Sequence, residues 1–236
     1  GRDSYTTVMA NGDKTSATAT STHNYSWTNQ NILSYVKEFN RNHRINATAV
    51  FEQMYSDDFI HKTEAKGGLV STIIGANNTA LGDVMYASGE RTKTAMMSWM
   101  GRVNYVLMDR YMLTASWRYD GSSRFSPDSR WGLFPSFSAG WRISEEEFMK
   151  DIDWLSNLKI RASYGTTGND MDLSKDPIDK VDAFSYLQKY QLGEKYIFGN
   201  NLANTIVAGA TPNYALTWAT STTYNGGLDF GFFNNR

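Results

Sequence analysis

Between residues 98 and 167, apolar and polar side chains alternate almost residue by residue in four separate runs. Successive side chains of a β-strand point to opposite faces, so each run predicts a strand with one apolar and one polar face. The apolar positions of the four runs are Trp99, Gly101, Val103, Tyr105 and Leu107; Tyr111, Leu113, Ala115, Trp117 and Tyr119; Trp131, Leu133, Pro135, Phe137, Ala139, Trp141 and Ile143; and Leu158, Ile160, Ala162, Tyr164 and Thr166. Tyrosine and tryptophan stand at the ends of several of these rows, as they do in the aromatic girdles of barrels that cross a membrane. The pattern predicts a transmembrane β-barrel.

The composition agrees with a barrel that is apolar outside and polar inside. Aromatic residues make up 14% of the 236 residues, yet the mean hydropathy is −0.49. No apolar run approaches the roughly 18 residues that would predict a transmembrane helix. The chain has no cysteine, which excludes thiolate metal sites, disulfides and cysteine nucleophiles. Its net charge of −1 gives no reason to expect nucleic acid as a partner.

Further strands are predicted on both sides of the four runs, over residues 25–40, 44–56 and 217–233. Tight connections follow residues 40, 108 and 233. Residues 144–156 form a compact connection, in which Ser-Glu-Glu-Glu at 144–147 has the sequence of a capping box that starts a helix.

The other connections are long, and they cover residues 57–92, 121–130 and 168–216. Short and long connections therefore alternate from strand to strand. Outer-membrane barrels have short periplasmic turns and long extracellular loops, so this alternation is a second indication of a barrel. Residues 186–207 form either two more strands around Leu192, Gly193 and Glu194 or a hairpin that stands out from the membrane. Their polarity favours the extracellular hairpin.

Both ends of the sequence predict a piece of a longer protein. Gly1 opens directly on a mixed polar stretch without a signal peptide, and the strand-like residues 224–233 are followed by only three residues. We therefore expect an all-β, antiparallel segment of an open, incomplete barrel with about seven to nine strands. Such a sheet leaves two unpaired edges, which lipid does not tolerate. The segment by itself is not expected to close or to transport.

Several blocks of the sequence resemble one family, the TonB-dependent outer-membrane transporters of the SusC/RagA type from Bacteroides-like bacteria. The blocks are RVNY at 102–105, YMLTASWRYDGSSRF at 111–125, WGLFPSFSAGWRI at 131–143 and WLSNLKIRASYGTTGN at 154–169, with weaker matches in PNYALTW at 212–218 and YNGGLDF at 224–230. The family usually has a glutamate after the last tryptophan, where this chain has Ala219. A carboxylate expected there is missing.

The resemblance implies that residues 1–236 are one part of a receptor barrel, with the plug domain, the TonB box and the signal peptide outside this chain. It further implies import of oligosaccharides or peptides through the outer membrane of a Gram-negative bacterium. A SusD-like lipoprotein would act as the lid, and the TonB–ExbB–ExbD complex would supply energy through regions absent here. The outer face would contact membrane lipid and lipopolysaccharide.

Charged residues of the polar phases are the candidates for a lumen-facing site: Arg102, Arg110, Arg118, Asp120, Arg142, Lys159, Arg161 and Asp229. The cations among them are interpreted either as a wall that contacts plug or substrate or as ordinary barrel lining paired with Asp120, Asp229 or carboxylates of the plug. We favour the lining, because charged lumens are general in such barrels.

Loop residues are the candidates for contact with substrate or partner: Arg124, Phe125, Tyr186, Tyr190, Tyr196 and Tyr214. Local packing of the loops is the alternative interpretation. The aspartates between residues 170 and 182 lack the spacing of an EF-hand, and the three histidines are dispersed. No metal site and no cofactor are therefore expected.

No motif of an enzyme is present, since the sequence lacks G-x-S-x-G, a P-loop and G-x-G-x-x-G. Two alternatives to an energised transporter remain open at this point. One is a passive porin-type channel, and the other is a soluble β-sandwich that acts as a binding module.

Overall fold

The computed structural model describes residues 2–10, 14–40, 42–66, 84–149, 152, 154–170, 184–199 and 201–232. These residues form an all-β structure. None of the helices among them is long and apolar enough to cross a membrane.

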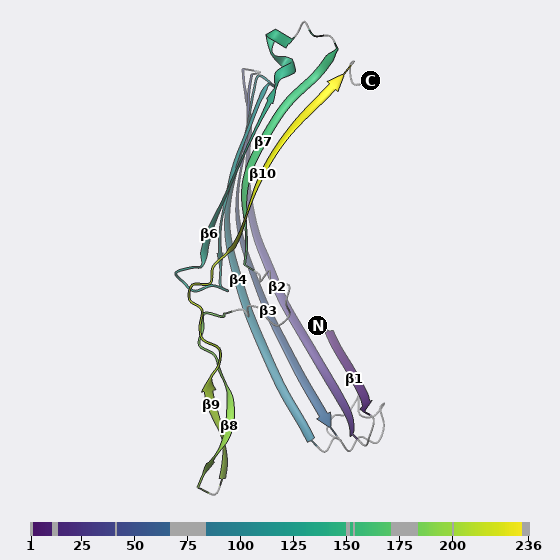
Figure 1. Ribbon diagram of the computed structural model, residues 1–236, viewed down its shortest axis with the longest axis vertical. Coiled ribbons are helices and arrows are strands. Elements are labelled where there is room, and N and C mark those ends of the chain that lie inside the picture. Colours follow the sequence, from purple (N-terminus) through teal and green to yellow (C-terminus); the bar gives the residue numbers. More distant parts are fainter. Residues whose placement is uncertain are drawn as a thin grey trace. The chain divides into compact units, whose positions relative to one another are not determined.

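Ten strands are described, and eight of them form one sheet (Figure 1). They are β1 (Arg2–Ala10), β2 (Lys14–Phe39), β3 (His43–Lys66), β4 (Val84–Leu107), β5 (Tyr111–Ser122), β6 (Trp131–Arg142), β7 (Leu155–Asn169), β8 (Tyr190–Phe198), β9 (Asn201–Ala208) and β10 (Ala219–Phe232). The order in the large sheet is β1-β2-β3-β4-β5-β6-β7-β10, and β8 and β9 form a separate pair. Sequential pairing of this kind, with antiparallel neighbours, confirms the predicted fold class. Eight strands lie within the predicted range.

The chain divides into two compact units, one of residues 1–28 and 54–95 and the other of residues 29–53 and 96–236. In the first unit β1 pairs with β2, and charged side chains pair both between β3 and β4 and along β3. Arg91 donates two hydrogen bonds, of 2.8 and 2.6 Å, to the Asp57 carboxylate. Glu64 lies 3.4 Å from Lys62 and 3.1 Å from Lys66. All the predicted site residues belong to the second unit.

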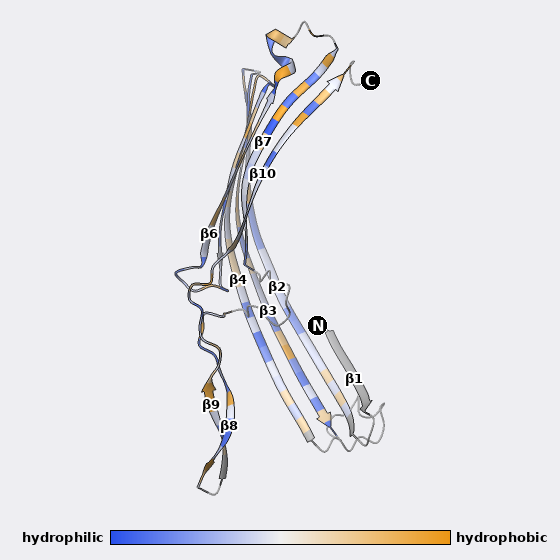
Figure 2. Ribbon diagram, viewed as in Figure 1, coloured by the Kyte–Doolittle hydropathy of each residue, from blue (hydrophilic) through white to orange (hydrophobic). Residues whose placement is uncertain are grey.

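The predicted alternation is clearest along β5 in the second unit. Exposed and half-buried residues alternate from Tyr111 to Tyr119, and the exposed ones are those of the apolar phase. Figure 2 shows the same alternation of hydrophobic and hydrophilic residues along β7 and β10. Because the strands are in register, each phase continues from strand to strand as a row. One apolar row is Val103, Ala115, Phe137, Tyr164 and Tyr224, and the adjacent polar row is Asn104, Thr114, Ser138, Ser163 and Asn225.

The structure corrects the predicted long connection over residues 57–92. β3 continues to Lys66 and β4 begins at Val84, so only residues 67–83 join them. The added strand residues mix polar and apolar side chains in both phases, and they are held by backbone pairing and by ion pairs such as that of Asp57 and Arg91. The connection between β1 and β2, residues 11–13, is short where the alternation would place a long one.

The predicted capping box is also wrong. The connection between β6 and β7 contains two short 3-10 helices, η2 (Ile143–Glu145) and η3 (Glu147–Met149). Ser144 lies inside η2, and the residue at the N-cap is Arg142, which makes no capping hydrogen bond with its side chain.

The predicted hairpin within residues 186–207 is present as β8 and β9, but its turn is not at residues 192–194. The chain reverses at Gly199, which has a φ of +64°, between Phe198 and Asn201. Residues 192–195 instead contain a shift in register, as a β-bulge does. The extracellular position of this hairpin stays a prediction.

The tight turn between β4 and β5 has left-handed backbone at both central residues. Met108 has a φ of 52° and Asp109 a φ of 55°, and the Arg110 N–H donates to the Leu107 carbonyl at 3.0 Å. Two successive residues with positive φ are typical of the type I′ turn, whose twist matches that of the strands it joins. Glycine or asparagine is the usual choice at such positions, and methionine is not.

A small buried cluster lies where the loops meet the sheet. Phe125, Phe134 and Trp218 are 3, 7 and 8% exposed, and the ring centroids of Phe125 and Phe134 lie 5.4 and 5.3 Å from that of Trp218. The Trp218 indole N–H donates to the Arg130 carbonyl at 2.9 Å. Phe134 belongs to the polar phase of β6, and a Cβ on Gly168 would lie 2.0 Å from its ring. The cluster therefore fixes the loop before β10 on the polar face.

Candidate functional site

The polar face of β4, β5, β6, β7 and β10 carries the predicted lumen-facing residues. Small hydroxyl and amide side chains form its middle. The Ser116 and Ser136 hydroxyls are 2.7 Å apart, and the Thr114 hydroxyl donates to the Asn104 amide oxygen at 3.0 Å. Charged residues lie on both sides of this band, and they form two groups with different partners.

Arg118 and Asp120 form the group nearer the loops. The Nε of Arg118 lies 2.8 Å from both carboxylate oxygens of Asp120, and the Arg118 Nη2 donates to the Ser98 hydroxyl at 3.0 Å. Glu52 of β3 adds a second carboxylate at 3.4 Å. Asp120 and Ser98 are 5 and 3% exposed, whereas the Arg118 side chain is 40% exposed, so the partners of the arginine are buried and the arginine itself is half-buried. Arg118 is thus paired with carboxylates, and its position in a barrel lumen stays a prediction.

Arg142, Lys159, Arg161 and Asp229 form the group nearer the tight turns. Lys159 lies opposite Arg142 on β6 and opposite Asp229 on β10. Arg161 is 3.5 Å from the Asp229 carboxylate, and its side chain is 63% exposed. Within the described part of the chain, neither Lys159 nor Arg142 has a side-chain hydrogen bond. This group therefore has three positive charges and one negative charge, and few hydrogen bonds fix the positions of its side chains.

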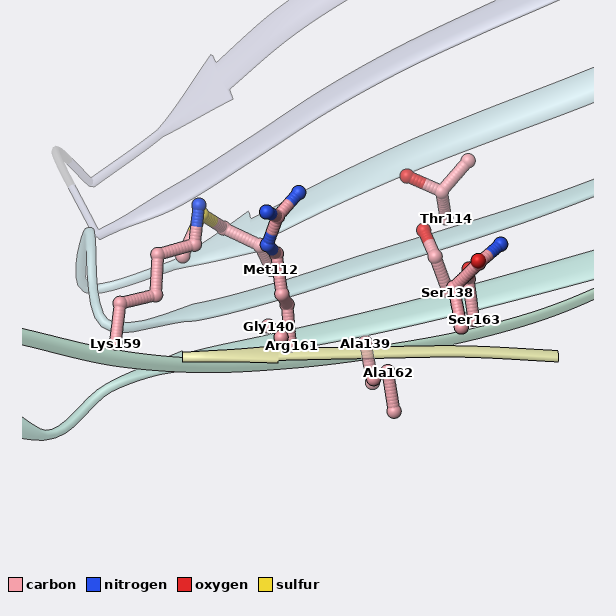
Figure 3. Close-up of a pocket in the computed structure, with 12 residues that line it drawn as sticks. Met112, Thr114, Ser138, Ala139, Gly140, Lys159, Arg161, Ala162 and Ser163 are labelled. Carbon is pink, nitrogen blue, oxygen red and sulfur yellow. The ribbon is translucent and has the colours of Figure 1, made fainter. Parts of the chain in front are cut away.

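A hollow of about 460 Å³ lies beside these cations (Figure 3). Lys159, Arg161 and Met112 rise from the same side of the sheet as Thr114, Ser138 and Ser163. Ala139 and Ala162 point to the opposite side, as their apolar phase predicts. The hollow thus belongs to the polar face.

The other two inner-face candidates lie apart from the hollow. Arg102 is exposed and donates to the Asn104 amide oxygen at 3.3 Å. Arg110 pairs with Glu146 at 3.1 Å, and the same carboxylate accepts hydrogen bonds from the Tyr111 hydroxyl at 2.6 Å and the Trp141 indole at 3.0 Å. The hydrogen bond from Tyr111, followed by that from Trp141, lowers the pKa of Glu146 below its usual value. Glu146 was not predicted as a partner for these residues.

The predicted loop residues have different surroundings. Arg124 lies 3.7 Å from Asp170, whose carboxylate also accepts a 2.7 Å hydrogen bond from Ser122. Phe125 is buried in the cluster with Trp218, so its ring serves local packing. Tyr186 packs edge-on against Phe184, with centroids 6.3 Å apart.

Tyr190, Tyr196 and Tyr214 are the loop candidates that the structure leaves open to contact. They are 70, 64 and 65% exposed. The Tyr214 carbonyl accepts hydrogen bonds from Ser126 and Ser129, which fixes the backbone of Tyr214 while its ring stays exposed. Tyr190 and Tyr196 lie on the β8–β9 hairpin.

Sequence reasoning named Asp120 and Asp229 as carboxylates that pair with the cations, and the structure places them beside Arg118 and Arg161. It missed the buried cluster and the other partners, Glu52, Ser98 and Glu146. Phe134 offered a signal, because it is a large aromatic residue in the polar phase of its run. Glu52 and Ser98 offered none, since their meeting with Arg118 depends on the register of β3, β4 and β5. The described residues contain no group of three or more histidines or acidic residues that could hold a metal ion.

Comparisons with known proteins agree with this architecture. The model of the TonB dependent receptor-like β-barrel family matches residues 1–236. The TonB-dependent receptor SusC of Bacteroides thetaiotaomicron is 44% identical over 148 residues, which are 61% of this chain and 14% of SusC. The TonB-dependent receptor P26 of Formosa agariphila is 34% identical over 215 residues, 89% of this chain and 20% of P26. The chain therefore spans between about a seventh and a fifth of these relatives.

Solved structures with the same fold include that of the RagAB peptide transporter. It aligns with a TM-score of 0.75 and 22% identity over 94% of this chain and 23% of that chain. The RagAB peptide importer in its closed-closed state aligns with a TM-score of 0.73 and 23% identity, with the same coverage. At this level of identity the likeness concerns the fold alone.

Proposed function

Because the chain belongs to the TonB-dependent receptor-like β-barrel family and is of the SusC/RagA type, we propose that it forms part of the wall of an outer-membrane transporter. The intact protein imports oligosaccharides or peptides across the outer membrane of a Gram-negative, Bacteroides-like bacterium. Transport, and not catalysis, is its activity. A SusD-like lipoprotein covers the extracellular side, and the TonB–ExbB–ExbD complex supplies the energy.

The contrast between the two faces of the sheet carries this proposal. Leu113, Phe137 and Tyr224 of the apolar phase are 51, 55 and 76% exposed, whereas the polar phase carries charged residues such as Asp120 and Arg161. A soluble β-sandwich packs its apolar face inward, so exposed apolar rows across five strands argue against that alternative. In an outer-membrane barrel the apolar face contacts lipid and the polar face lines the lumen. The arrangement supports the membrane assignment.

The β8–β9 hairpin supports a protein partner on the loop side. A two-stranded hairpin is marginally stable on its own in water. Leu192, Phe198 and Ile206 of this hairpin are 73, 77 and 71% exposed, in addition to Tyr190 and Tyr196. Exposed apolar patches of this kind mark interaction surfaces. We assign the hairpin to contact with the lipoprotein.

Energy dependence separates the proposed transporter from a passive porin-type channel, because both have the same kind of wall. Uptake of a labelled oligosaccharide or peptide mixture is compared in cells that express the receptor, in cells that lack it, and in cells that lack TonB. We expect uptake to require both the receptor and TonB. Uptake that persists without TonB would favour the porin.

Topology is tested in the same cells with a membrane-impermeant maleimide. A cysteine in place of Ser123, in the long β5–β6 loop, is expected to label on intact cells. A cysteine in place of Asp109, in the tight β4–β5 turn, is the matched control and is expected to label only after permeabilisation. The reverse result would invert the proposed orientation.

A further inference from the structure

Arg161 lies in a slot that two glycines keep open. Its register neighbours are Gly140 on β6 and Gly227 on β10, so neither adjacent strand places a side chain beside it. A Cβ on Gly227 would lie 2.6 Å from the Arg161 Nε, which shows that the side chain rests on this glycine. The distance to Asp229 is 3.5 Å, longer than the 2.7–2.9 Å of a charge-assisted hydrogen bond. The guanidinium therefore keeps donors for another acceptor.

Lys159 supplies a second cation on the same face. The two residues are two positions apart on β7, so their Cα atoms are separated by about 7 Å. The stem of Lys159 lies over Gly140, with its Cε and the Met112 Cε both 3.4 Å from the position of a Cβ there. Within the described residues no acceptor lies within hydrogen-bond distance of its ammonium group. Two positive charges are thus held side by side with little to neutralise them.

The rest of the hollow provides small polar groups. Ser138, Ser163 and Asn225 form the adjacent row of the sheet, and in the described part of the chain their side chains have no hydrogen-bond partner. Among the described residues no carboxylate lines the hollow, and the nearest partner of its cations is Asp229, 3.5 Å from Arg161. The volume of about 460 Å³ falls within the roughly 300–1,000 Å³ of small-ligand sites.

We propose that this hollow binds the carboxylate groups of acidic substrates as they pass along the lumen. Arg161 and Lys159 hold the charge, and the hydroxyl row holds neighbouring polar groups of the same molecule. The ligand is a carboxylate-bearing oligosaccharide or an acidic peptide. This inference rests on the proposed function and names the substrate class that the wall selects. The hollow is lined by small glycine and serine residues beside two longer cationic side chains. This shape fits a small charged group better than it fits a flat protein surface.

The test uses the intact receptor in lipid nanodiscs and two matched pairs of probes. One pair is tetragalacturonate and its methyl ester, and the other is tetraglutamate and tetraglutamine. Each pair differs in charge and little in shape, and together they distinguish a sugar from a peptide source of the carboxylate. Binding is measured by calorimetry for wild type, Arg161→Gln, Lys159→Gln and the charge-matched control Lys93→Gln, which lies outside the hollow.

We expect wild type to bind the charged member of one pair more tightly than its neutral partner. Arg161→Gln and Lys159→Gln are each expected to weaken that binding about tenfold and to leave the neutral member unchanged, since a lost charge-assisted bond has roughly this effect. Gly227→Ala keeps the charge of Arg161 but places a methyl group where its side chain now lies. This variant is therefore expected to weaken binding of the charged member in the same selective way. Lys93→Gln is expected to behave as wild type.

If the receptor binds the charged and the neutral member of each pair with equal affinity, and also takes up the neutral member, the inference is overturned and the proposed function stays intact. The inference would also be overturned if Arg161→Gln lowered the thermal stability of the receptor without ligand and weakened the binding of the charged and the neutral member equally. Such a result would show that the cations pair with carboxylates of the protein itself. Failure of the receptor to bind any of the four probes, with TonB-dependent uptake of the oligosaccharide or peptide mixture retained, would overturn the inference and leave the proposed function intact. Loss of that uptake as well would contradict both.

Discussion

The side chains on the two faces of β5, β6 and β7 differ in the contacts that they make within the protein. On the polar face near the loops the large residues have partners: Arg118 bonds to Asp120 and Ser98, and Phe134 packs against Trp218. On the apolar face Leu113 and Phe137 lie next to other apolar residues in the sheet but stay more than half exposed. The stability of the sheet therefore depends on protein contacts on one side and on the surrounding solvent on the other. A substitution is expected to have an effect set by its face more than by its size.

The largest effect is expected for Trp218→Ala. This change opens a cavity between Phe125 and Phe134 and removes the hydrogen bond to the Arg130 carbonyl, so it should cost about 3–5 kcal/mol. The measurement is urea unfolding of the intact receptor in lipid vesicles. Trp117→Ala is the control. Trp117 lies on the apolar face and is 47% exposed, so its loss should lower the unfolding free energy by less. Equal losses for both tryptophans would remove the distinction between the faces.

A charge on the apolar face is expected to have the next largest effect. Leu113→Arg should destabilise the receptor by roughly 2–4 kcal/mol if the residue lies near the middle of the bilayer. Ser116→Arg, on the polar face of the same strand, should be mild. The same unfolding titration compares the two variants. Similar costs on both faces would contradict the assignment of lipid and lumen.

A smaller, pH-dependent effect is expected at Glu146, which joins the two phases at the tight-turn end. It accepts bonds from Arg110 of the polar phase and from Tyr111 and Trp141 of the apolar phase. Because these bonds lower the pKa of Glu146 in the folded state, its contribution to stability is present above the unfolded value of about 4.3. It is lost as the pH falls through the lower folded value. Glu146→Gln should therefore be less stable than wild type at pH 7, and the difference should vanish in acid. A difference that persists at low pH would show that the lost bonds are not those of the carboxylate.

The smallest effect is expected in the β4–β5 turn, which belongs to neither face. Met108 has a φ of 52°, a conformation that asparagine and glycine adopt more easily. Met108→Asn should raise the unfolding free energy by about 0.5–1 kcal/mol. Destabilisation by this change would mean that the methionine side chain, and not the backbone, determines the turn.

The sequence predicted best where a strand has two unlike faces. The register of β5 and β6 follows the apolar and polar phases that their residues define, and the turn at residues 108–110 falls between two such runs. The prediction failed where polar and apolar side chains are mixed in both phases. Residues near Asp57 and Arg91 have the composition of a loop, yet backbone pairing and a cross-strand ion pair extend β3 and β4 through them.

The cations of the candidate site and their pairing with Asp229 were predicted, but the glycine contacts of these cations were not. The alternation placed Lys159 and Arg161 on one face, but the glycines beside Arg161 gain their meaning only from the pairing of β6, β7 and β10. Phe125 is a similar case, since its burial depends on Trp218, which is 93 residues away in the chain. Contacts between distant residues follow from the register, which local patterns determine only in part.

The central claim is that one face of β5 contacts lipid while the other lines a polar lumen. Nitroxide labels at each position from Tyr111 to Asp120, one at a time in the intact receptor in vesicles, test this claim directly by their collisions with oxygen and with a water-soluble nickel complex. The account predicts oxygen maxima at residues 111, 113, 115, 117 and 119 and nickel maxima at the residues between them. A flat profile, or one with the two phases exchanged, would contradict it.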